Sequence, residues 1–193
     1  MWKLIALLIL VVFFATSGAQ AATLNVIGGQ LLGASGVDVG GTIYDVEFVR
    51  GSCIDLFNGC NEDADFVFNS GAHAALASQA LLDQVLIDSA LGLFDTQPTE
   101  VAAVGCPILD GTGLFACYRL TPFSQTPFTT DVHTSASLNY VNNMSDHVET
   151  GAVKSVFDTG VSWAVWTPVP EPGTAVLMGL GLLGLSVRKH REG

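Results

Sequence analysis

Basic residues are scarce in this chain. Only seven of its 193 residues are lysine or arginine, against 18 aspartates and glutamates, so the formal net charge is −11. Binding to nucleic acid depends on clustered lysine and arginine, and that class of function is excluded. Charged residues of both signs make up only 13% of the chain, about half the share that is usual in a soluble domain. Such a composition requires apolar residues to gather in particular segments, and two of these lie at the ends of the chain.

Several signatures of fold and function are also missing. The chain contains no internal repeat, which excludes a solenoid or a propeller. It contains neither H-E-x-x-H nor G-x-S-x-G, the motifs of zinc proteases and of hydrolases with a serine nucleophile. Histidine, the side chain most often used in acid–base catalysis, occurs only four times. We therefore expect a protein that is not an enzyme and that needs no cofactor.

The first 21 residues contain the three parts of a secretory signal peptide in their usual order. Lys3 supplies a positive charge, residues 4–15 form an uninterrupted apolar run of 12, and Ala19 and Ala21 are the small residues of a cleavage site. A run of this length is short for a membrane-spanning helix, which needs roughly 20 residues. We expect residues 1–21 to be removed during export by the general secretory machinery.

The last 25 residues, 169–193, follow a different order. They begin with a short motif: Val169, Pro170, Glu171 and Pro172. Its two prolines fix φ and remove backbone donors, which prevents a helix there. An uncharged, largely apolar stretch follows at 174–187, and a basic cluster comes after it: Arg188, Lys189 and Arg191. A helix over 174–187 is about 21 Å long. It can span the ~30 Å hydrocarbon core if the bilayer thins and the basic side chains extend to the cytoplasmic side.

This tail resembles the PEP-CTERM sorting signal of Gram-negative bacteria, which combines a Pro-Glu-Pro motif, a short apolar helix and a terminal basic cluster. The resemblance implies recognition by an exosortase, a multi-pass membrane transpeptidase, with processing near the motif. It implies that the body first lies in the periplasm, anchored in the inner membrane by its tail, and then reaches the cell surface or the extracellular matrix. An ordinary single-pass anchor is the alternative that the same span and flanks leave open.

The body between these segments, residues 22–168, is acidic and contains all four cysteines. Its basic residues number three, against 16 acidic ones. An even number of cysteines in an oxidising compartment predicts two disulfides. Among three possible pairings we favour Cys53 with Cys60 and Cys106 with Cys117, because each closes a short loop that contains glycine. The spacings of six and ten intervening residues do not suit a zinc site.

Alternation of apolar and polar residues predicts strands at 23–33, 42–49, 114–120, 136–140 and 161–165. In the third of these, Cys117 and Arg119 fall on the face opposite to that of Leu120. One helix is expected at about 71–92, with Ser70 as its N-cap, and 122–145 is expected to form loops. The predicted fold is α+β: a β-rich, mostly antiparallel exported domain with one main helix, flanked by a signal peptide and a C-terminal transmembrane helix.

An acidic loop offers a weak candidate for a calcium site. Its oxygen-bearing side chains include Asp55, Asn58, Asn61, Asp63 and Asp65. Ca²⁺ takes six to eight oxygen ligands, commonly from one flexible loop. The EF-hand pattern fails, because its third and fifth positions hold Phe57 and Gly59. A solvated turn closed by a disulfide is the favoured interpretation.

We expect the body to act as a structural or interaction component of the cell surface, linked to exopolysaccharide or to other surface proteins. Two alternatives stay open: a calcium-stabilised adhesin domain, and an exported metal-dependent hydrolase that uses His133, His147 and neighbouring acids. Exposed tryptophan or tyrosine side chains flanked by aspartate or asparagine commonly form platforms for sugars. The candidates are Trp163, Trp166, Tyr140 and Asn142, although aromatic residues at strand spacing more often belong to a core.

Overall fold

The computed structural model describes residues 21–98, 103, 106, 108–109, 115–123, 131–140 and 146–170. Within them the chain forms a mostly antiparallel sheet and one main helix, which confirms the β-rich α+β fold predicted from the sequence. Ala21 is exposed at the start of the described chain. The rest of the predicted signal peptide and the predicted transmembrane helix at 174–187 lie outside the described residues.

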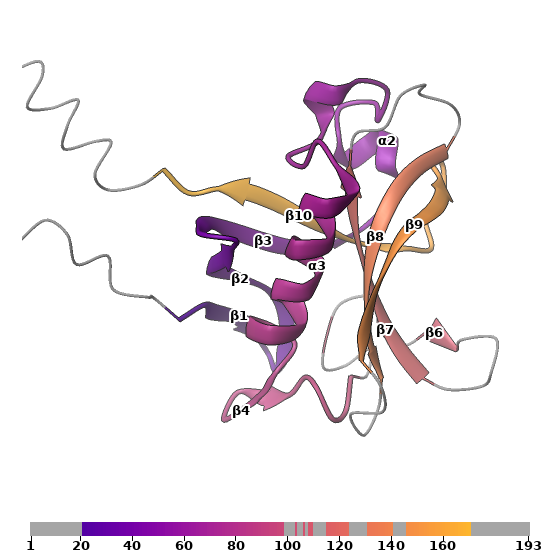
Figure 1. Cartoon of the computed structure of the whole chain (residues 1–193). Helices are drawn as coiled ribbons and strands as arrows, with labels where there is room; N and C mark the ends of the chain where they lie inside the picture. The colour runs from indigo at the N-terminus through magenta and orange to yellow at the C-terminus, as the bar shows by residue number, and fades with distance from the viewer. Residues whose placement is uncertain are drawn as a thin grey trace, which may run out of the picture.

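The sheet consists of two antiparallel meanders joined by the last strand. The first contains β1 (Thr23–Ile27), β2 (Gln30–Val39) and β3 (Thr42–Arg50). The second contains β7 (Phe115–Phe123), β8 (Asp131–Tyr140) and β9 (His147–Ser155), with the short β6 (Ile108–Leu109) beside β7. β10 (Ser162–Pro168) lies between them, antiparallel to β3 and parallel to β7. The strand order is β1-β2-β3-β10-β7-β8-β9, and the two meanders cross at a steep angle (Figure 1).

Glycine pairs make both tight turns of the first meander. Gly28 and Gly29 join β1 to β2, and Gly40 and Gly41 join β2 to β3, all four with positive φ. Two-residue turns of this kind match the twist of the flanking strands, but they require a conformation that residues with a Cβ avoid. The local sequence therefore fixes this meander, and the strand expected at 23–33 is a hairpin, as its central glycines indicate.

The main helix, α3 (Gly71–Gln84), lies in front of the sheet and contacts β2, β7, β8 and β9 (Figure 1). Ser70 is its N-cap, as predicted, and its Oγ accepts from the backbone N–H of His73. Most of the side chains that face the sheet are small: Ala74, Ala77 and Ser78 are buried, and Leu81 is the one large buried side chain of this helix. Small side chains allow a close approach, and the Ser78 hydroxyl donates to the Ser135 carbonyl of β8 at 3.1 Å.

The prediction that this helix continues to about residue 92 is wrong. The N–H groups of Val85 and Leu86 both donate to the carbonyl of Leu81, which closes the helix. The chain then forms a small hairpin of β4 (Asp88–Ser89) and β5 (Gly92–Leu93). The Asp88 carboxylate accepts hydrogen bonds from groups of residues 95 and 96. Such bonds from an aspartate to nearby groups compete with helix continuation.

The strand predicted at 136–140 is confirmed as the second half of β8. The loop predicted over 122–145 is wrong in part, because β8 already begins at residue 131, and β9 was not predicted at all. β8 is rich in serine and threonine, yet both of its faces are buried. Its polar side chains find partners inside the fold. Thr134 Oγ1 donates to the Ala152 carbonyl at 3.1 Å, and the hydroxyls of Ser135 and Thr150 lie 3.1 Å apart. These partners come from β9, so the local pattern of β8 does not reveal its burial.

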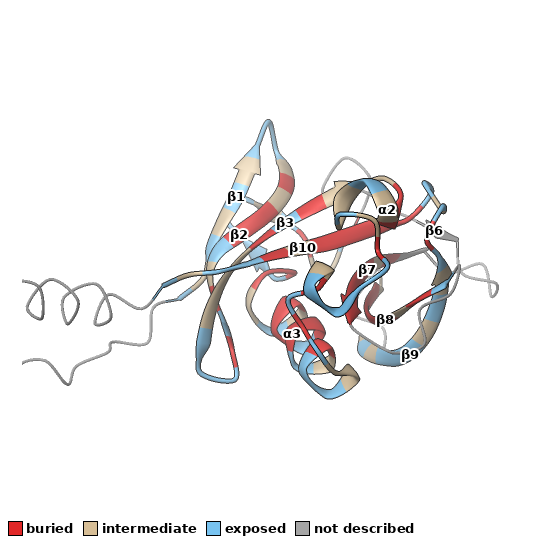
Figure 2. Ribbon diagram, turned by 90° about the horizontal axis from the view of Figure 1, so that it is seen from above, coloured by how far each residue is buried: buried red, intermediate tan, exposed pale blue. Residues whose placement is uncertain are grey.

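Two apolar clusters fill the two sides of the central strands. Figure 2 shows that buried residues gather in the central strands and in α3. The larger one lies between α3 and the sheet: Leu31, Val37, Val46, Phe48, Leu81, Val85, Phe94, Phe123 and Trp166. The second lies on the other face, under α2 (Cys53–Leu56) and η1 (Asp63–Asp65): Cys53, Cys60, Phe66, Leu120, Leu138, Val156, Val161 and Trp163. β10 contributes a tryptophan to each cluster, so the strand that ends the domain is held from both sides.

Candidate functional site: the sorting motif and the domain beside it

The predicted sorting motif begins where β10 ends, with no linker between them. Pro168 is still paired with Tyr44 of β3, and the N–H of Val169 donates to the Ile43 carbonyl at 2.9 Å. Pro170 is exposed and is the last described residue. The four residues from Pro170 to the start of the apolar stretch can reach at most about 14 Å. A tail anchored in a membrane therefore keeps this end of the sheet close to the membrane surface.

The first and last residues of the domain lie at the same end of the strands. Thr23 at the start of β1 is paired with Ser35 of β2. Two residues along β2, Val37 is paired with Tyr44 of β3, and Tyr44 is also paired with Pro168 at the end of β10. In Figure 1 both ends point away from the half formed by β7, β8 and β9. The β7–β9 half is consequently the part of the domain that lies farthest from the sorting motif.

A protein-family model for the PEP-CTERM protein-sorting motif matches residues 168–191. The chain carries a PEP-CTERM sorting motif. This motif implies export, a C-terminal tail anchored in the membrane before processing, and an exosortase as the processing partner that directs the protein to the cell surface. The match begins at the last residue of β10 and does not extend into the domain. No curated protein and no solved structure matches the chain.

The structure describes only the first residues of the PEP-CTERM motif. Glu171 and Pro172, the predicted helix at 174–187 and the basic tail lie outside the described residues, as does Ala19 of the predicted cleavage site. Among the residues that are described, no helix is both long enough and apolar enough to cross a membrane.

Both disulfides are present and all four cysteines are buried. Cys53 is bonded to Cys60, with Cα atoms 5.8 Å apart, and Cys106 to Cys117, with Cα atoms 4.8 Å apart. This is the pairing that the short loops favoured. The first bond closes the loop that carries α2, and the second ties residue 106 to β7. Each is expected to stabilise the domain by about 2–3 kcal/mol, because it restricts the unfolded chain.

The predicted calcium ligands are held by hydrogen bonds within their own loop. The Ser52 hydroxyl donates to Asp55, and the Asn58 amide donates to Asp65 at 3.2 Å. The N–H groups of Asn61 and Glu62 donate to the other oxygen of Asp65. Desolvation by itself would raise the pKa of Asp65. The three hydrogen bonds to its carboxylate outweigh this effect, and the pKa is lowered. Over the described ranges, no three acidic, histidine or cysteine side chains come together in a metal-binding arrangement. This holds for the predicted ligand Asp63 as well.

His133 and His147 lie on neighbouring strands but do not converge. His133 of β8 is opposite Val153 of β9, whereas His147 of β9 is opposite Leu138, five residues farther along β8. Five residues of a strand span about 17 Å, and successive side chains alternate between the faces of the sheet. The two rings therefore lie on opposite faces, and they cannot share a metal ion or act on the same substrate atom.

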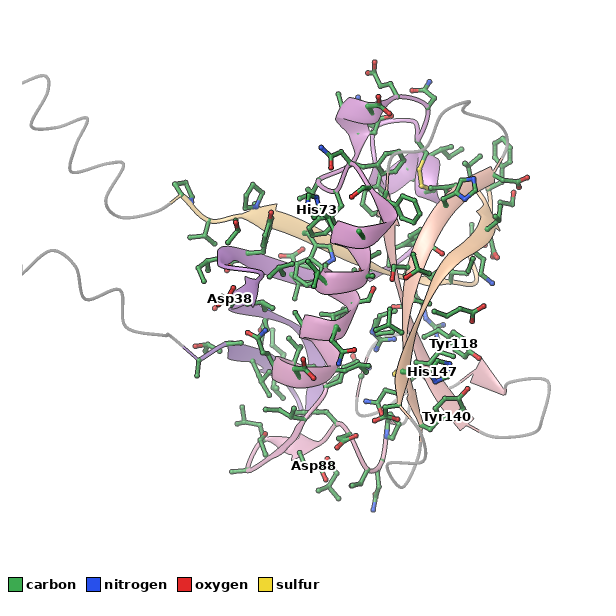
Figure 3. All side chains as sticks on the ribbon, viewed as in Figure 1. Asp38, His73, Asp88, Tyr118, Tyr140 and His147 are labelled. Atoms are coloured by element: carbon green, nitrogen blue, oxygen red, sulfur yellow. A yellow bond between two sulfur atoms is a disulfide. The ribbon has the colours of Figure 1, made fainter. Side chains whose placement is uncertain are left out.

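The aromatic side chains considered as a sugar platform are mostly inside the protein. Trp163 and Trp166 are buried, one in each apolar cluster. Tyr140 is half-buried and stacks on His147 with ring centroids 6.0 Å apart (Figure 3). Asn142 lies outside the described residues. The two tryptophans act in packing rather than in binding.

Arg119 is the polar residue that sequence analysis misplaced. It was predicted on a half-buried strand, on the face opposite to that of Leu120. In the structure it is fully buried, with its guanidinium 4.5 Å from the centre of the Phe48 ring. Burial first, and then the positive charge of Arg50, lower the pKa of Arg119 to about 9. Within the described chain its Nε has no hydrogen-bond partner, and the same holds for Ser137 Oγ and Asn139 Oδ1 on the adjacent strand. No local signal distinguishes such a residue from a surface arginine.

A group of aspartates joins the β4–β5 hairpin to the end of β8. Burial first, and then a hydrogen bond and charge repulsion from Asp146 and repulsion from Asp88, raise the pKa of Asp95 to about 6. Asp146 itself accepts a bond from the Tyr140 N–H at 2.7 Å. Asp95 is therefore expected to keep its proton in slightly acidic solution. No sequence pattern predicts this pair, because its members are 51 positions apart.

Proposed function

We propose that the domain is a non-enzymatic structural or interaction component that is delivered to the cell surface or extracellular matrix. The observation that carries this proposal is the direct continuation of β10 into the PEP-CTERM motif. Before processing, the tail holds the domain against the membrane, and the β7–β9 half lies on the far side. After processing near the motif, the folded domain is released from its own anchor as one rigid unit.

The surface charge supports an interaction role. Of the three basic residues of the body, Arg119 is buried and Lys154 is half-buried. The exposed face of the domain is therefore dominated by carboxylates, which repel anionic polymers and attract cationic groups. We propose that the partners are basic surface proteins, or neutral or amino-bearing exopolysaccharide. The link to exopolysaccharide depends on the resemblance of the tail to signals found in species that make such polymers.

The proposal is tested by locating the full-length protein in its native host. Wild type is compared with a variant in which Pro170, Glu171 and Pro172 are all alanine. Antibodies against the domain should label intact wild-type cells, and the variant should stay in the inner membrane. Wild-type protein found only in the periplasm would contradict a surface role. The polysaccharide is then digested enzymatically, and the wild-type protein is followed in the matrix fraction. Its release from that fraction supports the link to polysaccharide. Unchanged fractionation refutes this link but leaves the surface role intact.

A further inference from the structure

A disulfide and a guanidinium lie in contact inside the domain. Nη2 of Arg119 donates to Sγ of Cys106 at 3.0 Å, and Nη1 donates to the Tyr118 carbonyl at 3.1 Å. Arg119, Cys106 and Cys117 are all completely buried. Arg119 follows Cys117 by two positions on β7, so both side chains point to the same face of the sheet. The sorting function uses neither group.

Among the described residues of the oxidised domain, no carboxylate compensates this buried cation or counters the lowered pKa of Arg119. A disulfide sulfur is neutral and only a weak acceptor. An uncompensated buried charge is costly, and a partner of opposite charge removes most of that cost. Reduction of the disulfide supplies such a partner in place, because it turns the sulfur that Arg119 already contacts into a possible thiolate.

We propose that Cys106–Cys117 is the reducible disulfide of this domain and exchanges with dithiols, and that Arg119 holds the released Cys106 sulfur as a thiolate. One thiolate of the dithiol attacks Cys117 Sγ and forms a mixed disulfide, while the electron pair of the broken bond stays on Cys106. The second thiolate of the dithiol then attacks the first sulfur of the same dithiol, which is bonded to Cys117 in the mixed disulfide. This releases Cys117, which takes up a proton. The dithiol becomes a cyclic disulfide and loses two electrons, and its second proton goes to water.

The other disulfide provides an internal control. Both disulfides lie in apolar clusters, Cys106–Cys117 in the one beside α3 and Cys53–Cys60 in the one with Phe66 and Trp163. A thiolate in such surroundings is destabilised by the loss of water, which raises the pKa of a cysteine. Because the guanidinium of Arg119 contacts Cys106 and offsets this loss there, reduction of Cys53–Cys60 is expected to be less favourable than reduction of Cys106–Cys117.

The first test is a redox titration of the oxidised full-length chain. The protein is equilibrated in buffers with different ratios of reduced to oxidised dithiothreitol, quenched with acid and alkylated, and each disulfide is followed by peptide mass. Because Cys106 and Cys117 are both buried, exchange is expected to be slow. Equilibrium is therefore confirmed by starting from the oxidised and from the reduced protein. Cys106–Cys117 should be half reduced at about a tenfold lower ratio than Cys53–Cys60, which corresponds to about 30 mV. Arg119→Gln should abolish this difference, and Arg119→Lys should keep most of it. Equal midpoints in the wild type, or the same difference in Arg119→Gln, would overturn the proposal.

A second test keeps Arg119 and does not depend on the folding of its variants. Cys117→Ser leaves Cys106 as a single thiol, and the matched Cys60→Ser variant leaves Cys53. The absorbance of the thiolate at 240 nm is followed against pH. Cys106 should ionise well below the ordinary cysteine pKa of about 8.5, and Cys53 at or above it. Ionisation of Cys106 at or above that value would also refute the role given to Arg119.

Discussion

Replacing Gly33 by alanine tests how β2 and β3 support the strand that ends in the sorting motif. Gly33 has φ of +149°, and a Cβ built on it collides with the backbone carbonyl of Val46 on β3. The conformation alone costs a residue with a Cβ about 1–3 kcal/mol. Pushing β3 away from β2 adds about 1–3 kcal/mol, as overpacking does in a core. We therefore expect Gly33→Ala to lower the free energy of unfolding by about 3 kcal/mol or more.

Gly28→Ala is the matched control. Gly28 also has positive φ, +60°, but no atom lies within 4 Å of a Cβ built on it. It should cost only about 1 kcal/mol, the price of a left-handed conformation. With an m-value of about 2 kcal/mol/M, the urea midpoint should fall by about 1.5 M in Gly33→Ala and by about 0.5 M in the control. Tryptophan fluorescence follows the transition. Equal shifts in the two variants would refute the close approach of β2 to β3.

Two further outcomes are expected. Because burial, Asp146 and Asp88 raise the pKa of Asp95 to about 6, its contribution to stability is complete below its ordinary pKa of 3.8 and is lost as the pH rises through 6. Asp95→Asn should reduce the fall in urea midpoint between pH 4 and pH 7, and a fall as large as in the wild type would show that the group is not coupled to folding. Trp163→Phe removes the indole N–H that donates to the Gly51 carbonyl at 2.8 Å, and should cost about 1–3 kcal/mol because a part-buried acceptor loses its partner. No loss in thermal or urea unfolding would mean that water replaces this bond.

The parts of the fold that sequence analysis predicted well depend on local signals. The alternation at 42–49 and the glycine pairs on either side of β2 define the first meander without help from the rest of the chain. Ser70 begins α3 in the same local way. The sorting motif is equally local, because its parts follow one another in the chain. The two disulfides close short loops, so their pairing is also accessible from spacing.

The parts that were missed depend on contacts between distant residues. α3 ends early because Asp88 bonds to residues 95 and 96 rather than to the next helical turn. Only the second half of β8 was predicted. Its first half looks polar, but β9 satisfies the hydroxyls of Thr134 and Ser135, and α3 contacts β8. Arg119 is buried because apolar clusters occupy both sides of β7. Period-two patterns assume that one face of a strand meets water, and that assumption fails for a strand covered on both faces.

The PEP-CTERM motif is expected to direct processing of the tail beside β10. The most direct test is the intact mass of the protein isolated from its native host, measured beside the variant with alanine at Pro170, Glu171 and Pro172. The wild-type mass should correspond to a chain that begins near residue 22 and ends near the motif, and the variant should keep the full tail. A full-length tail in both proteins would contradict it and would leave the apolar stretch as an ordinary membrane anchor.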